Sequence, residues 1–589
     1  MRELSYLNKY LFKYKKYYLL GTGFILISTF FALVPATLIR ETFDLIEEGV
    51  ASYSNGDLIS RDETLEYVLI YAGGIILAAV IRGLFMYMMR QTIIVASRNI
   101  EYDLKNEIFF HYQTLPSQFY KENNTGDLMN RISEDVSRVR MYIGPALMYG
   151  MNVTILMLTI IPFMFYINSK LAFYSILPLP LLVLSIYYVQ NIINKRSEEI
   201  QESLSDLSTY VQETFSGIRL IKSFVREENF SSVFSKKSVE YKDKSLRLQF
   251  VLSLFFPIIM TLIGLSIIIT VYIGAIEVFS NNITIGNIAE FLIYVYLLTW
   301  PVTSLGWITS IVQRASASQK RINQFLKEEN NITSSENITI DLKGKIEFKN
   351  VSFTYPDTNI TGLKNISFKI ESGESLGVIG TTGSGKSTLA NSILRLFDIS
   401  EGNILIDDNK IEDFDVVNLR RQIGYVPQDV FLFSDTIENN ILFGAKNKTF
   451  NHVVEAAENA DLTRNIQTFP DEYKTMVGER GITLSGGQKQ RISIARAIIK
   501  KPKILILDDC LSAVDTKTEN KILENLKTIM LDKTTIIISH RISSVKLAKK
   551  ILVMDEGKVI EEGNHQDLLK KRGEYYKIYK NQIEEEKIN

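Results

Sequence analysis

A glycine-rich stretch at residues 380–388 (GTTGSGKST) has the residue types and the spacing that bind a polyphosphate. It fits the pattern G-x-x-x-x-G-K-[ST], which is informative when it lies between a strand and a helix. An apolar run at 375–379 predicts the strand, and residues 387–396 predict the helix. The residues expected to bind a nucleotide in this loop are Gly380, Gly383, Ser384, Gly385, Lys386, Ser387 and Thr388.

The chemistry of this loop follows from its residue types. Glycines lack a Cβ atom, so successive backbone N–H groups can turn toward a phosphate chain. The N-terminus of the following helix adds a partial positive charge. Lys386 can reach the β- and γ-phosphates, and the Ser387 hydroxyl can bind Mg²⁺. The sequence therefore predicts a site for a nucleoside triphosphate with Mg²⁺.

Polar residues follow three other apolar runs. Gln428 comes after residues 424–427 (GYVP), and its side chain is a candidate ligand of Mg²⁺. Asp508 ends the run ILIL, a position from which a carboxylate can hold Mg²⁺ or its waters. His540 follows residues 535–539, which we expect to be the last strand, and it is a candidate either for contact with the γ-phosphate or for a capping role. Strands that alternate with helices predict a mostly parallel sheet covered by helices.

Two further features belong to this half of the chain. Tyr355 ends an alternating run at 346–355, where its ring could stack on an adenine or belong to the core. Residues 484–488 (LSGGQ) place Ser485 and the amides of two glycines at the start of a predicted helix, which makes a second phosphate cradle. The two cradles lie about 100 residues apart and need not meet within one subunit.

Composition limits what the rest of the chain can be. A chain of 589 residues is too long for one domain. Lys plus Arg and Asp plus Glu both number 66, so no net charge favours nucleic acid as a partner. The single cysteine, Cys510, excludes an intramolecular disulfide. Long apolar runs occur only before about residue 313, and the first of them does not have the pattern of a cleavable signal peptide.

Six segments of the first half are long enough to cross a bilayer, which takes about 20 apolar residues. They are residues 17–39, 67–89, 143–167, 171–193, 250–279 and 285–312. Five basic residues precede the first span, whereas the loop at 40–66 holds two and the loop at 280–284 holds none. This asymmetry predicts a multi-pass protein of the plasma (inner) membrane with both termini in the cytoplasm.

Two connections on the predicted cytoplasmic side, 90–142 and 194–248, each exceed 50 residues and have helix-like periodicity. We expect the second to fifth spans to continue through them as helices, because structureless loops of that length are uncommon. Such hairpins would either transmit motion or serve as solvated stalks. The charged residues inside the spans are Arg82, Glu277 and Glu290. Arg82 and Glu290 could line a substrate path, although a structural ion pair or snorkelling is favoured.

These features divide the chain into predicted parts. They are an α-helical six-span domain with long cytoplasmic extensions at 1–325, a polar linker at 326–344, an α/β domain with the phosphate loop at 345–583 and a charged tail at 584–589. With these residues the chain resembles the half-transporters among ATP-binding cassette (ABC) exporters. The resemblance covers nearly the whole chain and includes 115–119 (LPSQF), 125–128 (TGDL), 212–219 (QETFSGIR) and 477–481 (VGERG), the last being typical of exporters rather than importers.

The resemblance implies a dimer in which each ATP, with Mg²⁺, lies between the phosphate loop of one subunit and the LSGGQ of the other. The residues that would act on ATP bound by the partner are Leu484, Ser485, Gly486, Gly487, Gln488 and Asp515. The catalytic residues would be Asp509, His540 and Gln428, and the ligands of Mg²⁺ would be Ser387, Gln428 and Asp508. The resemblance also implies that the fourth and fifth spans cross over to contact the partner's nucleotide-binding domain.

One residue departs from the family's pattern. Most active members carry Glu directly after the position of Asp508 as the general base, and this chain has Asp509. A carboxylate that is one methylene shorter lies about 1 Å further back, which can lower the rate ~100-fold. The run at 508–515 (DDCLSAVD) resembles the degenerate-site subunit of heterodimeric bacterial multidrug exporters.

We therefore expect an exporter subunit that couples ATP hydrolysis to outward transport of a small amphipathic substrate. Its expected partners are the lipid bilayer and a second ABC half-transporter, with a heterodimer favoured over a homodimer and with no nucleic acid. A drug, a lipid or a peptide remains open as the substrate. The alternatives are a homodimeric exporter in which Asp509 is a slow base, and a regulatory subunit that binds ATP without hydrolysing it.

Overall fold

The computed structural model describes residues 2–54, 59–334, 336–511 and 516–588. The chain divides into two compact units. The first contains Met1–Gln113 and Gly126–Glu328, and the second contains Thr114–Thr125 and Glu329–Asn589. The short segment between residues 114 and 125 therefore belongs to the same unit as the α/β half of the chain.

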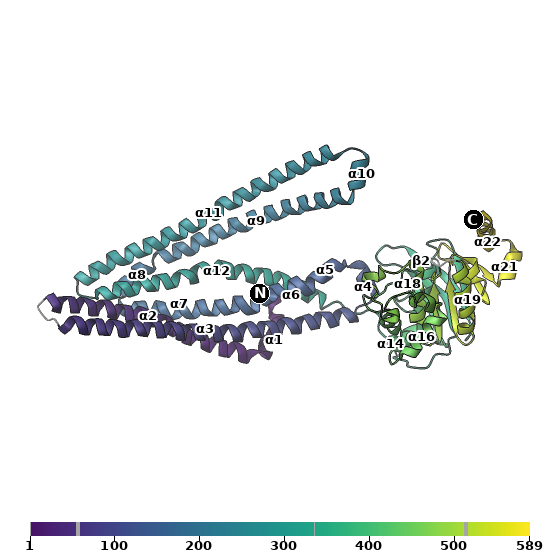
Figure 1. Ribbon diagram of the computed structural model, residues 1–589, viewed down its shortest axis with the longest axis horizontal. Coiled ribbons are helices and arrows are strands. Elements are labelled where there is room, and N and C mark those ends of the chain that lie inside the picture. Colours follow the sequence, from purple (N-terminus) through teal and green to yellow (C-terminus); the bar gives the residue numbers. More distant parts are fainter. Residues whose placement is uncertain (1, 55–58, 335, 512–515, 589) are drawn as a thin grey trace. The chain divides into compact units, whose positions relative to one another are not determined.

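The first unit is helical (Figure 1). After a 3₁₀ turn at Arg2–Leu7, its helices are α1 (Asn8–Lys13), α2 (Lys15–Ser54), α3 (Ile59–Thr114), α5 (Thr125–Asn130), α6 (Val136–Met141), α7 (Leu147–Ile167), α8 (Ser169–Ile176), α9 (Pro178–Ser216), α10 (Ile218–Ser223), α11 (Glu227–Phe279) and α12 (Ile285–Phe325). Two π-helical turns, Arg131–Asp135 and Tyr142–Ala146, join α5, α6 and α7 into one rod.

Six segments of the described chain are long and apolar enough to cross a membrane, as the sequence predicts. The fourth span is broken after α8 because Pro178 is the first residue of α9. Proline has no N–H to donate to the preceding turn, so it starts a helix more readily than it continues one. Pro178 therefore marks the boundary between two helices within this span.

The prediction that the spans continue as long helices is confirmed by α3, α9 and α11. Helix α3 has 56 residues, so it is about 80 Å long. Helices α9 and α11 run side by side and are joined by α10 (Figure 1). Near their tip, Tyr210 stacks on Phe230 with ring centroids 5.8 Å apart. The exposed large apolar side chains at the tip include Phe215, Leu220, Phe224 and Val225.

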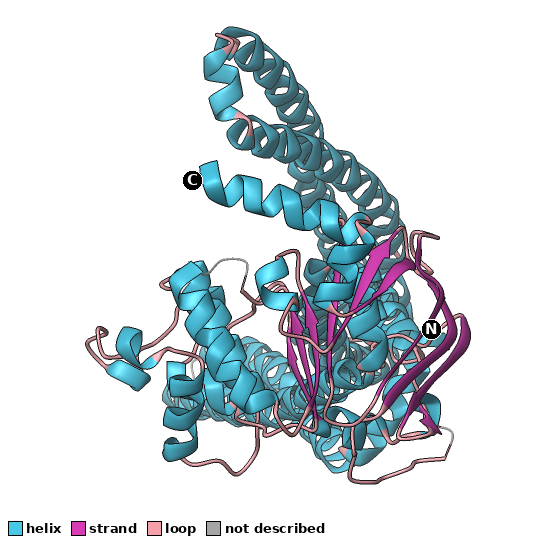
Figure 2. Ribbon diagram, turned by 90° about the vertical axis from the view of Figure 1, so that its right-hand side faces the viewer, coloured by secondary structure: helices cyan, strands magenta, loops and turns pink. Residues whose placement is uncertain are grey.

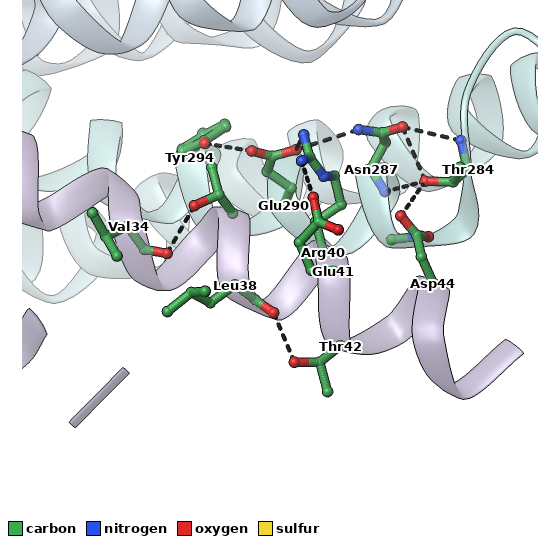
Figure 3. Close-up of polar contacts among 12 residues, drawn as sticks. Val34, Leu38, Arg40, Glu41, Thr42, Asp44, Thr284, Asn287, Glu290 and Tyr294 are labelled. Carbon is green, nitrogen blue, oxygen red and sulfur yellow. Dashed lines mark hydrogen bonds and ion pairs between the residues drawn. The ribbon is translucent and has the colours of Figure 1, made fainter. Parts of the chain in front are cut away.

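Helix α12 packs closely against α2 through a polar network around Glu290 (Figure 3). The buried Glu290 carboxylate accepts hydrogen bonds from the Tyr294 hydroxyl at 2.6 Å and from Asn287 Nδ2 at 3.3 Å. Arg40 of α2 approaches it at 3.5 Å. A Cβ atom on Gly286 would lie 2.4 Å from the Arg40 carbonyl oxygen, so this close approach requires glycine.

The charges in the predicted spans therefore have different surroundings. The ion-pair interpretation is confirmed for Glu290, which pairs with Arg40 rather than facing a substrate path. Glu277 pairs with Lys170 at 2.8 Å and also accepts a hydrogen bond from Asn282. Arg82 lines a cavity instead.

The second unit contains two sheets with helices packed around them (Figure 2). The strands are β1 (Ile346–Thr354), β2 (Thr361–Ile370), β3 (Ser375–Gly380), β4 (Glu401–Ile406), β5 (Asn409–Lys410), β6 (Ile423–Val426), β7 (Ile504–Asp508), β8 (Thr534–Ile538), β9 (Lys550–Asp555) and β10 (Lys558–Gly563). One sheet has the order β2-β1-β4-β5 and is antiparallel. The other has the order β10-β9-β3-β8-β7-β6, and all of its strands except β10 are parallel.

The helices of this unit surround two separate hydrophobic cores. They are α4 (Ser117–Glu122), α13 (Lys386–Ile393), α14 (Val416–Gln422), α15 (Ile437–Leu442), α16 (Phe450–Asn459), α17 (Thr463–Ile466), α18 (Gly486–Ile498), α19 (Thr516–Met530), α20 (Ile542–Val545), α21 (His565–Lys571) and α22 (Glu574–Ile588). The prediction that 535–539 is the last strand is wrong, because β9 and β10 follow it. The run of β9 is short and has charged residues at both ends, which hid it in the sequence.

Candidate nucleotide-binding site

Four adjacent parallel strands bring the predicted site residues to one edge of the larger sheet. In the register, Ile538 of β8 lies opposite both Val378 of β3 and Asp508 of β7. Gly380 and His540 each come two residues further along their chains, and Gln428 comes two residues after β6. Because the carboxyl ends of parallel strands meet at one edge, ligands bind there in open α/β sheets.

The phosphate loop joins β3 to α13, and its shape depends on glycine. Gly383 and Gly385 have φ angles of +83° and +94°, which residues with a Cβ atom rarely adopt. A Cβ atom on Gly380 would lie 2.0 Å from the Met554 carbonyl oxygen, and one on Gly385 would lie 2.1 Å from that of Gly362. The loop backbone therefore lies so close to neighbouring segments that a Cβ atom at either position would collide with them. This geometry fits a cradle for phosphate groups.

Lys386 is the cation of this loop, and only 6% of it is exposed. Its ammonium donates hydrogen bonds to the carbonyl oxygens of Gly380 at 3.0 Å and Thr381 at 2.7 Å. Burial lowers the pKa of Lys386, whereas the nearby carboxylates of Asp508 and Asp509 act in the opposite direction. The side chain is thus held inside the loop, where it can bind phosphate oxygens.

Asp508 ends β7 and is 2% exposed. Burial raises the pKa of Asp508, and a hydrogen bond from the Ser387 hydroxyl opposes that shift. These two groups and the exposed Gln428 side chain offer only hard oxygen ligands, which suit Mg²⁺. Ser387, Gln428 and Asp508 would hold the ion. When bound, Mg²⁺ would offset the negative charge of the phosphate groups.

Asp509 and His540 lie next to this group. Asp509 is 8% exposed, its N–H donates to the Ile538 carbonyl oxygen at 2.8 Å, and its φ of +45° is in the left-handed region. Aspartate tolerates that region better than most residues with a side chain. Burial and the positive charge of Lys386 lower the pKa of His540. The neutral imidazole is therefore favoured, and it can donate one hydrogen bond.

Two residues that the sequence did not point to hold the segment after β8 in place. Gln582 of α22 donates from Nε2 to the His540 carbonyl oxygen at 2.6 Å and accepts from the Ile542 N–H at 2.9 Å. Glu519 of α19 is buried, pairs with Arg541 and accepts a hydrogen bond from Ser543 at 2.7 Å. Neither residue belongs to a local motif, so no sequence pattern signals its role.

Tyr355 combines features of both roles weighed for it. Its hydroxyl lies 2.9 Å from the Thr388 hydroxyl, which ties the residue to the phosphate loop. Its ring packs edge-on against Phe397 with centroids 5.8 Å apart. The ammonium of Lys121, from α4 of the same unit, lies 5.1 Å from the Tyr355 ring centroid. Stacking on an adenine stays a prediction for this ring.

The residues LSGGQ form the exposed N-terminus of α18. Ser485 and Gln488 make a reciprocal capping box, in which Gln488 Oε1 accepts from the Ser485 N–H at 2.9 Å and Ser485 Oγ accepts from the Gln488 N–H at 3.3 Å. Leu484 is buried in one of the two hydrophobic cores of this unit, whereas α13 packs in the other. The phosphate loop and LSGGQ are therefore anchored in different hydrophobic cores. Asp515 lies outside the described residues.

The phosphate loop after β3, the carboxylates at the end of β7 and the histidine after β8 define a nucleoside triphosphatase domain of the phosphate-loop class. A second cradle at the N-terminus of a separate helix adds the feature that distinguishes the ABC type. Six apolar helices precede this domain in the same chain.

Comparison with known proteins gives the family. The ABC transporter transmembrane region family matches residues 18–302, and the ABC transporter family matches residues 363–512. The chain is 38% identical over 522 residues to the probable multidrug resistance ABC transporter ATP-binding/permease protein YheI of Bacillus subtilis, covering 88% of this chain and 89% of that protein. It is 33% identical over 589 residues to the multidrug resistance-like ATP-binding protein MdlA of Escherichia coli, covering 99% and 97% of the two chains.

A solved structure of a bacterial Atm1-family ABC exporter with ATP bound shares the fold. The TM-score is 0.78 at 24% identity, and the match covers 96% of this chain and 98% of that one. The chain therefore belongs to the ABC transporter family and has the fold of an ABC exporter subunit. It is a multi-pass protein of the plasma membrane whose ATPase domain is fused to six spans.

Replacing Lys386 by alanine should weaken ATP binding to the full-length chain by about 10- to 100-fold, because the phosphates lose a charged hydrogen-bond donor. Equilibrium binding of a labelled, non-hydrolysable ATP analogue would measure this. Lys558→Ala removes an exposed lysine on β10 and should leave the affinity unchanged. Equal affinities for the two variants would remove Lys386 from the site.

Replacing Gln582 by alanine should loosen the segment that carries His540. Loss of the bond to the Ile542 N–H is worth about 1 kcal/mol, so peptides spanning residues 540–545 should exchange amide hydrogens about fivefold faster. Hydrogen-exchange mass spectrometry of the full chain tests this, with the exposed neighbour Asn581→Ala as the control. Unchanged exchange in the Gln582 variant would show that α22 does not position His540.

Proposed function

We propose that this protein is one subunit of a dimeric ATP-driven exporter of amphipathic compounds, and that its own ATP site is the slower of two. The observation that carries the proposal is the combination at one sheet edge. A complete set of phosphate-binding groups lies there beside Asp509, a carboxylate one methylene shorter than the family's usual general base. The names of the two curated relatives, both of the multidrug resistance type, support export of small compounds.

Each group at this edge has a task in binding and cleaving ATP. The loop N–H groups and Lys386 bind the β- and γ-phosphates, and His540 donates a hydrogen bond to a γ-phosphate oxygen. Asp509 would act as the base for the attacking water, but a side chain of this length stops about 1 Å short of the usual place, at a cost of ~100-fold in rate. The site is therefore suited to binding ATP and hydrolysing it slowly.

The second cradle supports a dimer. Ser485 and Gly486 are exposed, and they offer the N-terminus of a 13-residue helix to an anion. Since LSGGQ is complete, it would supply the Ser485 side chain, the glycine amides and the helix N-terminus to the ATP bound by the partner. In a heterodimer, the partner would carry Glu after its own strand-ending Asp, and its site would do most of the hydrolysis.

The tip of the α9–α11 hairpin supports the same arrangement. Its exposed side chains include Phe215, Leu220, Phe224 and Val225, and they lie beyond the apolar part of both helices. A cluster of this kind in water is typical of a contact surface. We infer that the partner's nucleotide-binding domain covers it, as crossing of the fourth and fifth spans would require. ATP-driven closure of the two domains would then move the spans through these helices.

The isolated full-length chain should hydrolyse ATP slowly, because both sites of a homodimer would carry the short carboxylate. Asp509→Glu should raise the rate at least tenfold, since a positioned general base is typically worth ~10²–10⁴-fold. Phosphate release by the purified chain measures this.

The left-handed backbone at Asp509 is less favourable for Glu, so the melting temperature of the variant must be recorded alongside. Asp509→Asn, which fits that backbone but cannot accept a proton, is the matched control. Brisk hydrolysis by the unchanged chain would favour a competent homodimer. No gain in a stably folded Asp509→Glu variant would instead favour a subunit that binds ATP for regulation.

A further inference from the structure

A cavity of about 800 Å³ opens among helices α2, α3, α7, α11 and α12 of the membrane unit. Its lining is mostly apolar and aromatic, and includes Tyr149, Phe256, Met260, Tyr296 and Trp300. Tyr149 packs against Trp300 with ring centroids 5.5 Å apart. The volume lies within the range of about 300–1,000 Å³ that is usual for sites of small molecules.

The charge of this lining has one sign. Among the described residues that line it, Arg82 and Arg90 are the charged ones, and none is an aspartate or a glutamate. Arg90 is exposed and donates to the Tyr149 hydroxyl at 3.3 Å. Arg82 is half-buried, lies in the apolar part of α3 and makes no hydrogen bond or ion pair within the described chain.

The two acids in the spans are not available to Arg82. Glu290 is bound by Arg40, Tyr294 and Asn287 (Figure 3), and Glu277 is bound by Lys170. Arg82 is thus a fixed positive charge in an apolar cavity with no counter-charge from the described chain. A charged side chain within a membrane segment is costly and usually faces a partner or a pathway. A guanidinium group is well shaped to bind a carboxylate through two parallel hydrogen bonds.

We propose that the cavity binds small amphipathic carboxylates, with the carboxylate on Arg82 and the apolar body against the aromatic side chains around Trp300. This assignment rests on the exporter function proposed above and names its substrate class. It predicts discrimination by charge as well as by hydrophobicity. A cationic amphipath would meet Arg82 and Arg90 and find no acid in the lining, so it would bind more weakly than a neutral one.

Three probes with one fluorescent body test the proposal: 11-(dansylamino)undecanoic acid, its primary amide, and the corresponding terminal amine. The full-length chain is placed in nanodiscs of phosphatidylcholine, and binding is measured without ATP after subtraction of empty nanodiscs. The acid should bind at least tenfold more tightly than the amide, because a charged hydrogen bond is lost in the amide, and the amine should bind most weakly. Equal affinity for the three probes would overturn the proposal.

Variants of Arg82 locate the effect. Arg82→Gln should reduce the affinity for the acid about tenfold and leave that for the amide unchanged, whereas Arg82→Lys should retain the preference for the acid. Arg98→Gln, on the same helix but paired with Glu101 at 2.9 Å, should bind all probes as the unchanged chain does. A preference for the acid that survives in Arg82→Gln, or is lost in Arg82→Lys and Arg98→Gln alike, would overturn the assignment.

Two further measurements distinguish binding of a carboxylate from binding of an anionic lipid, and binding from transport. Replacing part of the phosphatidylcholine by phosphatidylglycerol should leave binding of the acid unchanged, and strong competition would identify an anionic lipid as the occupant instead. Because binding is measured without ATP, it does not depend on hydrolysis or transport. If the acid binds through Arg82 but ATP does not drive its movement into inside-out vesicles, the exporter function fails while the binding site stands.

Discussion

The register of the parallel strands β3, β8 and β7 is the constraint on which the ATP site depends. It places Val378, Ile538 and Asp508 in one row, so that the phosphate loop, His540 and the two carboxylates all emerge at the same edge. Burial then shifts the pKa values of these groups: it lowers the pKa of Lys386 and His540 and raises that of Asp508. Side chains alternate between the two faces of a strand, so a slip of one residue in β7 would turn Asp508 to the opposite face of the sheet.

Features encoded by neighbouring residues could be predicted from the sequence. The phosphate loop needs glycine within a few positions of Lys386, and a span needs about 20 apolar residues in succession. Contacts between distant residues could not be predicted. Gln582 is 42 residues from His540, and Arg40 is 250 residues from Glu290. Local patterns did not indicate β9 and β10, or the separate cores that hold the two phosphate cradles.

The charged residues in the membrane unit have two kinds of surroundings. A buried charge with partners holds helices together, whereas a charge that lines a cavity can bind a ligand. Glu290 is enclosed by α2 and α12, where glycine at position 286 allows the helices to approach. Its pairing with Arg40 fixes how these two helices lie against each other. Arg82 has no such partner among the described residues and faces a cavity. Sequence alone gives both residues the same description, a charge inside an apolar run, and the surroundings decide between the two roles.

We infer that the two ATP sites of the dimer are unequal and that this chain's LSGGQ serves the faster one. The most direct test compares ATP hydrolysis by complexes with the unchanged partner that carry either Gly487→Asp or Asp509→Asn. An aspartate in the first turn of α18 suits the helix N-terminus, so the variant should fold, yet its carboxylate would repel the γ-phosphate held by the partner. We expect a loss of about 100-fold for Gly487→Asp and a much smaller loss for Asp509→Asn. Comparable losses would contradict this inference.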